Sequence, residues 1–125
     1  MNKLVWIACG GLIGTLCRYL LSAWIDERSH SSFPYGTLAV NLTGCFVAGL
    51  LFPVLERASV LPELRLAVFT GFLGGFTTFS AYGLQTVVLA NNAMLSIAAL
   101  NVALSNIGGL LMVGLGYGIG RTAGS

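Results

Sequence analysis

The third apolar stretch of the chain contains the sequence Gly71-Phe72-Leu73-Gly74-Gly75-Phe76-Thr77-Thr78-Phe79-Ser80-Ala81-Tyr82. Glycines and two adjacent threonines stand at its centre and weaken a helix there. Glycine loses the most conformational entropy on folding, and the branched threonine side chain is restrained in a helix. We expect either a helix that breaks within this segment or one that is merely kinked at Gly74-Gly75.

Outward from this segment, four apolar stretches occupy nearly the whole chain. They cover residues 4–25, 35–55, 64–90 and 93–119, and each has the length of about 20 residues that crossing a bilayer requires. Of the 125 residues, 56% are hydrophobic and 8% are charged, whereas a soluble domain is about 25% charged. Mean hydropathy is +0.87. The composition excludes a soluble globular protein and predicts an all-α membrane protein with one four-span domain, residues 1–125.

A break in the third span at membrane depth would have to be shielded from lipid. Irregular backbone survives there only when it is buried in protein or lines a cavity, because lipid offers no hydrogen bonds. Carbonyl groups freed at such breaks are the groups with which broken transporter helices hold small cations.

The charged residues are few and lie mostly outside the four stretches. The net charge of +2 comes from six Lys and Arg without a cluster, which is too little for nucleic-acid binding. Lys3, Arg57, Arg65 and Arg121 fall on the side of the two termini and Arg28 on the other. This small imbalance favours cytoplasmic termini only weakly and permits insertion in both orientations.

Arg18 lies deep in the first stretch. An ionised side chain at that depth is costly unless it snorkels to the membrane surface or faces a cavity. Arg18 therefore either reaches toward Asp26 or Glu27, or provides a positive field at the mouth of an anion pathway. No Asp or Glu lies inside any of the four stretches, which argues against proton-coupled or cationic-drug transport.

Polar side chains also occur in the second and fourth stretches. Asn41 stands in the middle of the second, and Asn101 and Ser105 share one helical face of the fourth. Such groups either join helices by hydrogen bonds or line a water-filled path.

The aromatic residues Phe79 and Tyr82 are one helical turn apart. Their ring edges carry positive quadrupole density that suits an anion. An aromatic pair alone is more often packing, but Thr77, Thr78 and Ser80 stand beside this one.

Together these residues resemble the Fluc (CrcB) family of small bacterial fluoride ion channels. The resemblance covers nearly the whole chain and rests on three ordered motifs: Gly10-Gly11 with Gly14 and Arg18, Gly36-Thr37-Leu38 with Val40-Asn41 and Gly44, and Gly71 through Ser80. Two positions depart from the family pattern: the second pore phenylalanine is Tyr82 here, and a serine one turn beyond Ser105 is Gly109.

The resemblance implies an antiparallel, dual-topology homodimer in the bacterial plasma (inner) membrane. Each subunit would contribute four spans with a broken third helix, and two fluoride pores would form. A structural sodium ion would be held between the subunits by the backbone carbonyls of Gly74 and Thr77. Arg18 would lie near a vestibule. The pore residues implied are Asn41, Thr78, Phe79, Ser80, Tyr82 and Ser105.

The expected function is passive efflux of cytoplasmic fluoride and protection from its toxicity, with fluoride, membrane lipid and a second copy as partners. Fluoride is strongly hydrated, and neutral donors can replace its water without trapping it behind a fixed charge. His30, the only histidine, has no nucleophile or ligand beside it, so we expect no enzyme. The alternatives are a small multidrug or quaternary-ammonium exporter, which would need an acidic residue in the first span, and a structural membrane subunit.

Overall fold

The computed structural model describes residues 2–123, and within these residues the chain forms only helices, turns and bends. The prediction of an all-α protein is confirmed. Four helical stretches are long and apolar enough to cross a membrane: Asn2–Ser29, Tyr35–Arg57, Pro62–Asn91 and Leu95–Thr122. At 1.5 Å per residue even the shortest extends about 35 Å, more than the bilayer core of about 30 Å.

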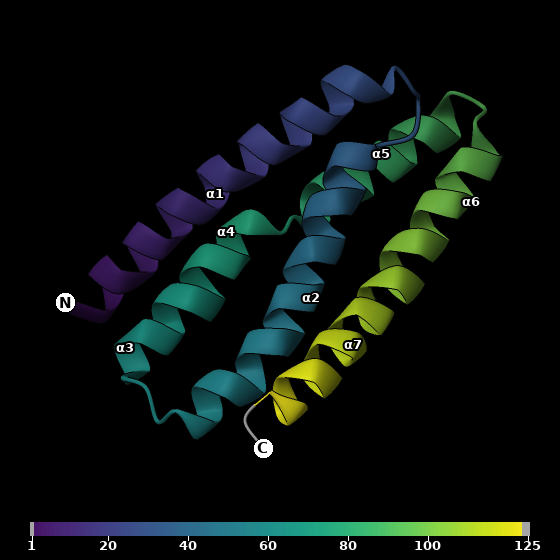
Figure 1. Ribbon diagram of the computed structural model, residues 1–125. Helices are drawn as coiled ribbons and strands as arrows, with labels where there is room; N and C mark the ends of the chain where they lie inside the picture. Colours follow the sequence, from purple (N-terminus) through teal and green to yellow (C-terminus); the bar gives the residue numbers. More distant parts are fainter. Residues whose placement is uncertain (1, 124–125) are drawn as a thin grey trace.

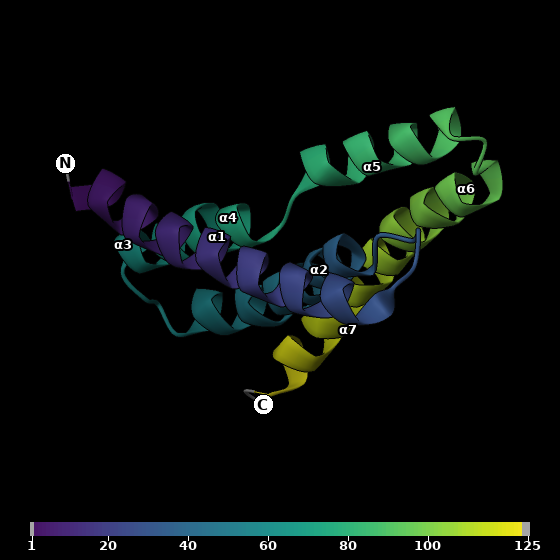
Figure 2. The same ribbon diagram turned by 90° about the horizontal axis from the view of Figure 1, so that it is seen from above.

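The first two stretches are single helices, whereas the other two are composite. The elements in chain order are α1 (Asn2–Ser29), α2 (Tyr35–Arg57), α3 (Pro62–Arg65), the π-helical η1 (Leu66–Leu73), α4 (Gly74–Phe76), α5 (Phe79–Asn91), α6 (Leu95–Ala103), the π-helical η2 (Leu104–Gly108) and α7 (Gly109–Thr122). The helices run side by side, with α1 against the α3–α4 arm and α2 against α7 (Figure 1). Figure 2 shows α5 standing out from this layer, beside α6.

Close backbone approach holds α1 to η1 and α2 to α7. A Cβ atom added at Gly10 would lie 2.2 Å from the Ala67 carbonyl oxygen, and one added at Gly116 would lie 2.2 Å from the Phe46 carbonyl oxygen. No side chain fits at either position, so the helices touch through their backbones, as small residues allow in membranes. A Cβ added at Gly114 or Gly118 would meet no atom of residues 2–123 within 4 Å, so this face of α7 packs against none of them.

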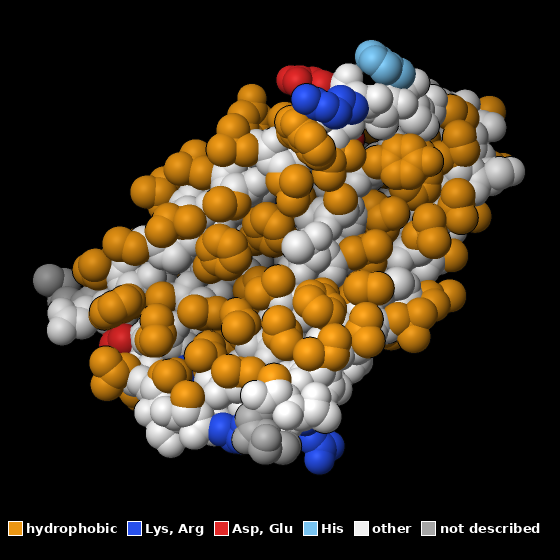
Figure 3. Space-filling view, viewed as in Figure 1, with side chains coloured by type: hydrophobic (Ala, Val, Ile, Leu, Met, Phe, Trp, Pro, Cys, Tyr) orange, Lys and Arg blue, Asp and Glu red, His pale blue; other side chains and the backbone are white. Residues whose placement is uncertain are grey.

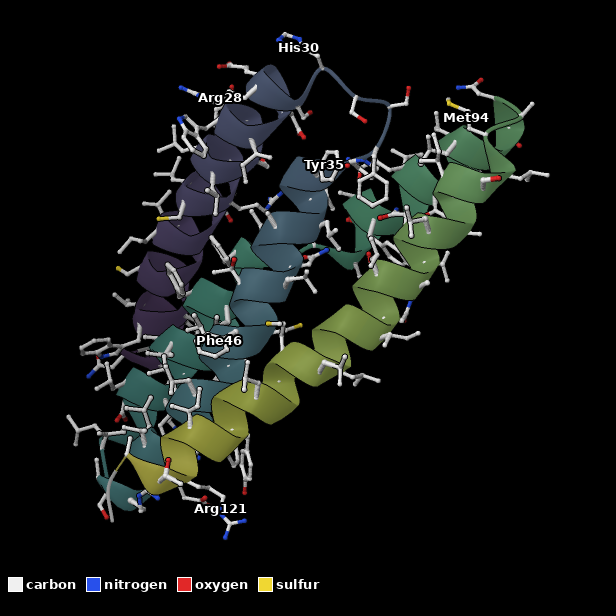
Figure 4. The ribbon with its side chains drawn as sticks, turned by 45° about the vertical axis from the view of Figure 1, so that its right-hand side comes forward. Arg28, His30, Tyr35, Phe46, Met94 and Arg121 are labelled. Carbon is white, nitrogen blue, oxygen red and sulfur yellow. The ribbon has the colours of Figure 1, made fainter. Side chains whose placement is uncertain are left out.

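The apolar side chains face outward rather than toward a central core. Figure 3 shows them covering the middle of the molecule, with charged side chains at the two ends. In Figure 4, Arg28, His30 and Met94 lie at one end and Arg121 at the opposite end. This distribution suits a molecule whose middle is surrounded by lipid.

Charged side chains also fix the helix ends. Asp26 Oδ1 accepts a hydrogen bond from the Gly36 amide at 2.8 Å and ties the end of α1 to the start of α2. Arg57 donates to the Arg121 carbonyl at 2.8 Å and to the Gly120 carbonyl. It thereby satisfies two carbonyls at the C-terminal end of α7, where a cation is favoured.

The glycines of α7 offer a matched test of this packing. Gly116→Ala places a methyl group against the Phe46 carbonyl and forces α2 and α7 apart, whereas Gly118→Ala enters open space. We expect Gly116→Ala to lower the free energy of unfolding by about 2 kcal/mol and Gly118→Ala to leave it within about 0.5 kcal/mol. Unfolding in detergent, followed by circular dichroism, measures both, and equal effects would contradict the backbone contact.

Candidate functional site

A cavity of about 240 Å³ opens where the α4–α5 connection meets α2 and η2. Its walls carry amide, hydroxyl and aromatic groups and no formal charge. The lining residues are Asn41, Cys45, Thr77, Thr78, Phe79, Tyr82, Ser105 and Asn106. Five of the six pore residues expected from the sequence thus meet in one place, although they come from three separate stretches of the chain.

The connection between α4 and α5 is extended backbone. α4 ends at Phe76, and the next two residues have φ −91°, ψ 156° at Thr77 and φ −148°, ψ 107° at Thr78. The glycines of this segment are not the irregular residues: Gly74 is helical, at φ −63°, ψ −35°. The linker that these two threonines form is visible between α4 and α5 in Figure 1.

Asn41 holds this extended backbone in place. Its Nδ2 donates to the Thr78 carbonyl at 3.1 Å, and its Oδ1 accepts from the Thr78 amide at 2.7 Å. The side-chain amide thus pairs with both backbone groups of one residue, as a neighbouring strand would. Both backbone groups of Thr78 therefore have hydrogen-bond partners, although Thr78 lies outside a helix. Backbone groups that are removed from water need such partners.

Thr78 also begins the next helix. Its Oγ1 accepts a hydrogen bond from the Ala81 amide at 3.2 Å, which makes it the N-cap of α5. Ser80, the sixth expected pore residue, does not line the cavity, but its hydroxyl lies 3.4 Å from Thr78 Oγ1. The two hydroxyls form one polar edge beside the cavity.

These hydrogen bonds leave two backbone carbonyls without their helical donors. In a continuous helix the Thr78 amide would donate to the Gly74 carbonyl and the Ala81 amide to the Thr77 carbonyl. Here the first donates to Asn41 and the second to the Thr78 side chain. Gly74 and Thr77 both border a second hollow of about 290 Å³ that also includes Gly44 and Leu73.

Arg18 reaches the same region from α1. Its Nε donates to the Gly75 carbonyl at 3.0 Å, near the C-terminal end of α4, where carbonyl groups carry partial negative charge. The side chain does not turn to the end of α1, where Asp26 accepts from Gly36 instead. Arg18 lines neither of the two hollows and lies on the α1 side of the connection.

The two aromatic rings stand together at the rim of the cavity. The Phe79 and Tyr82 centroids are 5.4 Å apart, with their planes tilted by 55°. Phe79 is 81% exposed, an unusual condition for an aromatic residue that lines a cavity. One side of its ring packs against Tyr82, and the rest of the ring lies on the surface of the protein.

The polar face of the fourth stretch divides into two parts. Asn101 is only 1% exposed and donates to Thr86 Oγ1 at 2.9 Å, so it joins α6 to α5. Ser105, one turn on, donates to Asn101 Oδ1 at 3.4 Å and lines the cavity. Asn101 is therefore an interhelical contact, whereas Ser105 lies at the cavity.

Sequence reasoning missed two lining residues. Cys45 lies one turn after Asn41 on α2, and helical periodicity alone would have found it. Asn106 follows Ser105 directly, and adjacent residues of an α-helix point in different directions. The wider turn of η2 brings both to the cavity, and the sequence carries no signal for that π-helical turn.

The fold and the cavity define a small multi-pass helical membrane protein with an uncharged polar site at the middle of its helices. The sequence model of the family described as "CrcB-like protein, Camphor Resistance (CrcB)" matches residues 5–117. The chain belongs to this family.

Curated relatives align over almost the full length. The chain is 44% identical over 123 residues to "Fluoride-specific ion channel FluC 1" of Bacillus cereus, which covers 96% of this chain and 90% of the relative. It is 43% identical over 120 residues to "Fluoride-specific ion channel FluC" of Acidobacterium capsulatum, at 95% and 96% coverage. The protein of the same name from Citrifermentans bemidjiense is 44% identical over 122 residues, at 97% and 98% coverage.

The pairing of Asn41 with Thr78 can be tested directly. Asn41→Leu keeps the side-chain volume but leaves the Thr78 amide and carbonyl unpaired, a cost of about 1–3 kcal/mol for each group. We expect faster hydrogen exchange at the Thr78 amide and a lower free energy of unfolding. Asn106→Leu is the matched control, because Asn106 lines the same cavity without bonding to Thr78. Unchanged exchange at Thr78 in Asn41→Leu would contradict the assigned role.

Proposed function

We propose that the protein is a fluoride-selective ion channel that lets cytoplasmic fluoride leave the cell passively and so protects against fluoride toxicity. The observation that carries this function is the cavity of neutral donors around Asn41, in a chain whose relatives are named as fluoride-specific ion channels. These relatives are named as channels, not as enzymes, and the protein is a channel rather than an enzyme.

The donors of the cavity suit a small, strongly hydrated anion. Asn41 Nδ2 uses one hydrogen on the Thr78 carbonyl, and its second hydrogen remains for a ligand. The Thr78 and Ser80 hydroxyls lie 3.4 Å apart and share one contact, so one of their two hydrogens remains to donate to a ligand. With ring edges beside them, these groups replace hydration water without a fixed charge that would hold the ion.

The driving force is external to the protein. Hydrogen fluoride crosses the membrane as a neutral molecule and dissociates in the less acidic cytoplasm, and an inside-negative potential then drives the anion outward. A pore needs no coupling group for this task. The runner-up, a quaternary-ammonium exporter, would need an acidic residue in the first span, residues 4–25, which contains none, and the relatives give it no support.

The working unit that we propose is an antiparallel homodimer in the bacterial plasma membrane, in contact with lipid. Phe79 is 81% exposed, so one subunit leaves the path open on that side. A second copy would supply the missing wall. The near balance of flanking charges permits the two orientations that an antiparallel pair requires.

In this assembly the third span is a broken helix at membrane depth. Thr77 and Thr78 lie at the middle of the stretch Pro62–Asn91, which supports this placement. Asn41, Thr78, Phe79, Tyr82 and Ser105 would line the pore. Ser80 would extend the polar edge. Arg18, whose terminal guanidinium nitrogens make no hydrogen bond to the described residues, would raise the anion concentration at a vestibule.

We also propose a structural sodium ion at the dimer interface, held by the Gly74 and Thr77 carbonyls of both subunits. The residues fit such a cation because both carbonyls have lost their helical donors to other groups. Uncharged oxygens at a helix break are typical ligands of sodium in membrane proteins. The bound ion would supply positive charge that keeps the two breaks together.

Fluoride efflux from proteoliposomes tests the proposed function. The unaltered protein should release trapped fluoride when a potassium ionophore balances the charge. Phe79→Ile should reduce this flux by at least about 100-fold, because the apolar volume remains while the positive ring edge is lost. Phe52→Ile is the control, since Phe52 packs against Phe69 on another face. Normal flux in Phe79→Ile would show that the ring only packs, and no flux in the unaltered protein would reject the channel.

Gly74→Val tests the dimer and its cation. Among the described residues, a Cβ at Gly74 would meet only the Phe69 carbonyl oxygen within 4 Å, at 3.8 Å, so the subunit itself tolerates the change. We expect Gly74→Val to abolish flux and to shift the protein from dimer to monomer in cross-linking and size-exclusion experiments. A stable, conducting Gly74→Val dimer would contradict the interface. Gly75→Val gives the contrasting result of a misfolded subunit, because its Cβ would lie 2.7 Å from the Gly11 carbonyl oxygen.

A further inference from the structure

Asn106 and Tyr82 form a hydrogen-bonded pair across the cavity wall. Asn106 Nδ2 donates to the Tyr82 Oη at 2.9 Å and to the Val102 carbonyl at 2.8 Å. Both side chains line the cavity that contains Asn41 and Ser105. The family resemblance places Tyr82 among the pore residues but gives Asn106 no role.

The hydrogen atoms available on Asn106 show which side chain donates in this hydrogen bond. A backbone carbonyl can only accept, so the Asn106 atom beside Val102 is the amide nitrogen and not the oxygen. That nitrogen carries two hydrogens, of which one goes to Val102 and the other to Tyr82. The Tyr82 oxygen is therefore an acceptor in this pair, and its own hydrogen must point elsewhere.

The Tyr82 hydrogen has no acceptor among the described residues, because the Asn106 contact is the only hydrogen bond in which its hydroxyl takes part. Tyr82 and Asn106, which donates to the Tyr82 hydroxyl, both line the cavity, so a hydrogen directed away from Asn106 is available to an ion there. Donation from the amide also polarises the hydroxyl and makes it a stronger donor, as happens along chains of hydrogen bonds.

We propose that Tyr82 donates its hydroxyl hydrogen to the conducted anion and that Asn106 is the positioning residue that directs it there. This inference rests on the proposed function, since it assumes that fluoride passes the cavity. It adds to the Tyr82 ring edge a hydroxyl donor that a phenylalanine cannot provide. A directed hydroxyl favours fluoride over chloride, because the smaller anion forms the shorter and stronger hydrogen bond.

A double-mutant cycle in proteoliposomes and planar bilayers tests the pair. Tyr82→Phe keeps the ring edge, so conduction should remain, while the fluoride concentration for half-maximal current should rise by about tenfold or more, the value of one hydrogen bond to an ion. Asn106→Leu should raise it by a similar factor. Both variants should also lower the permeability of fluoride relative to chloride.

The double variant decides how Asn106 acts. If Asn106 works through Tyr82, adding Asn106→Leu to Tyr82→Phe should change the half-saturating concentration by less than about twofold. Asn91→Leu, an exposed asparagine at the end of α5, is the control and should match the unaltered protein. If Asn106→Leu does not yield a dimer, Asn106→Ala replaces it in the cycle.

Each other outcome overturns a stated part of the inference. An unchanged half-saturating concentration in Tyr82→Phe would show that the hydroxyl does not contact the ion. An equal effect of Asn106→Leu in both backgrounds would show that Asn106 acts independently of Tyr82. Failure of the proposed function is distinct from both, because the unaltered protein would then carry no fluoride current.

Discussion

The reciprocal pairing of the Asn41 side chain with the Thr78 backbone is the interaction on which the site depends. It occupies the amide that would otherwise close the next turn of α4, so the chain remains extended through Thr77 and Thr78. The extended segment turns α5 out of the helix layer, as Figure 2 shows, and thereby sets Phe79 at the rim of the cavity. The same bond leaves the Gly74 carbonyl without its donor. One amide on α2 thus determines the irregular backbone, the aromatic rim and the freed Gly74 oxygen.

A bond of this kind holds its geometry only in a rigid frame, and close helix packing provides that frame. The fully buried side chains are few; Val40 and Asn101 are the largest, at 0% and 1% exposure. A water-soluble protein of this size would need a far larger apolar core. Here the apolar side chains face outward, as a membrane protein allows, and van der Waals contact between backbones, as at Gly10 and Gly116, takes the place of a core. The arrangement leaves the middle of the molecule free for polar groups that make specific bonds.

The sequence predicted the helical class and the four apolar stretches because both follow from hydropathy alone. It also indicated an irregular segment in the third stretch, partly because of its glycines. In the structure Gly74 is helical, and the extended residues are Thr77 and Thr78. Local propensity favours irregularity at glycine, but the partner that stabilises it is 37 residues away. Asn106 was missed for a similar reason. The turn that directs it to the cavity is π-helical, and the spacing of apolar residues in the sequence does not reveal a π-helical turn.

Arg18, the charged residue deepest within the four stretches, lies outside the cavity. A fixed cation in contact with fluoride would bind it strongly and slow its exit, since Coulomb attraction grows as the dielectric constant falls. Arg18 instead meets the Gly75 carbonyl, at the end of α4 where the peptide dipoles leave partial negative charge. In the proposed channel its field would attract anions toward this region, while the cavity itself is lined by neutral groups. A positive charge near the entrance would help an anion to enter, and several weak hydrogen-bond donors inside the pore would let it leave again.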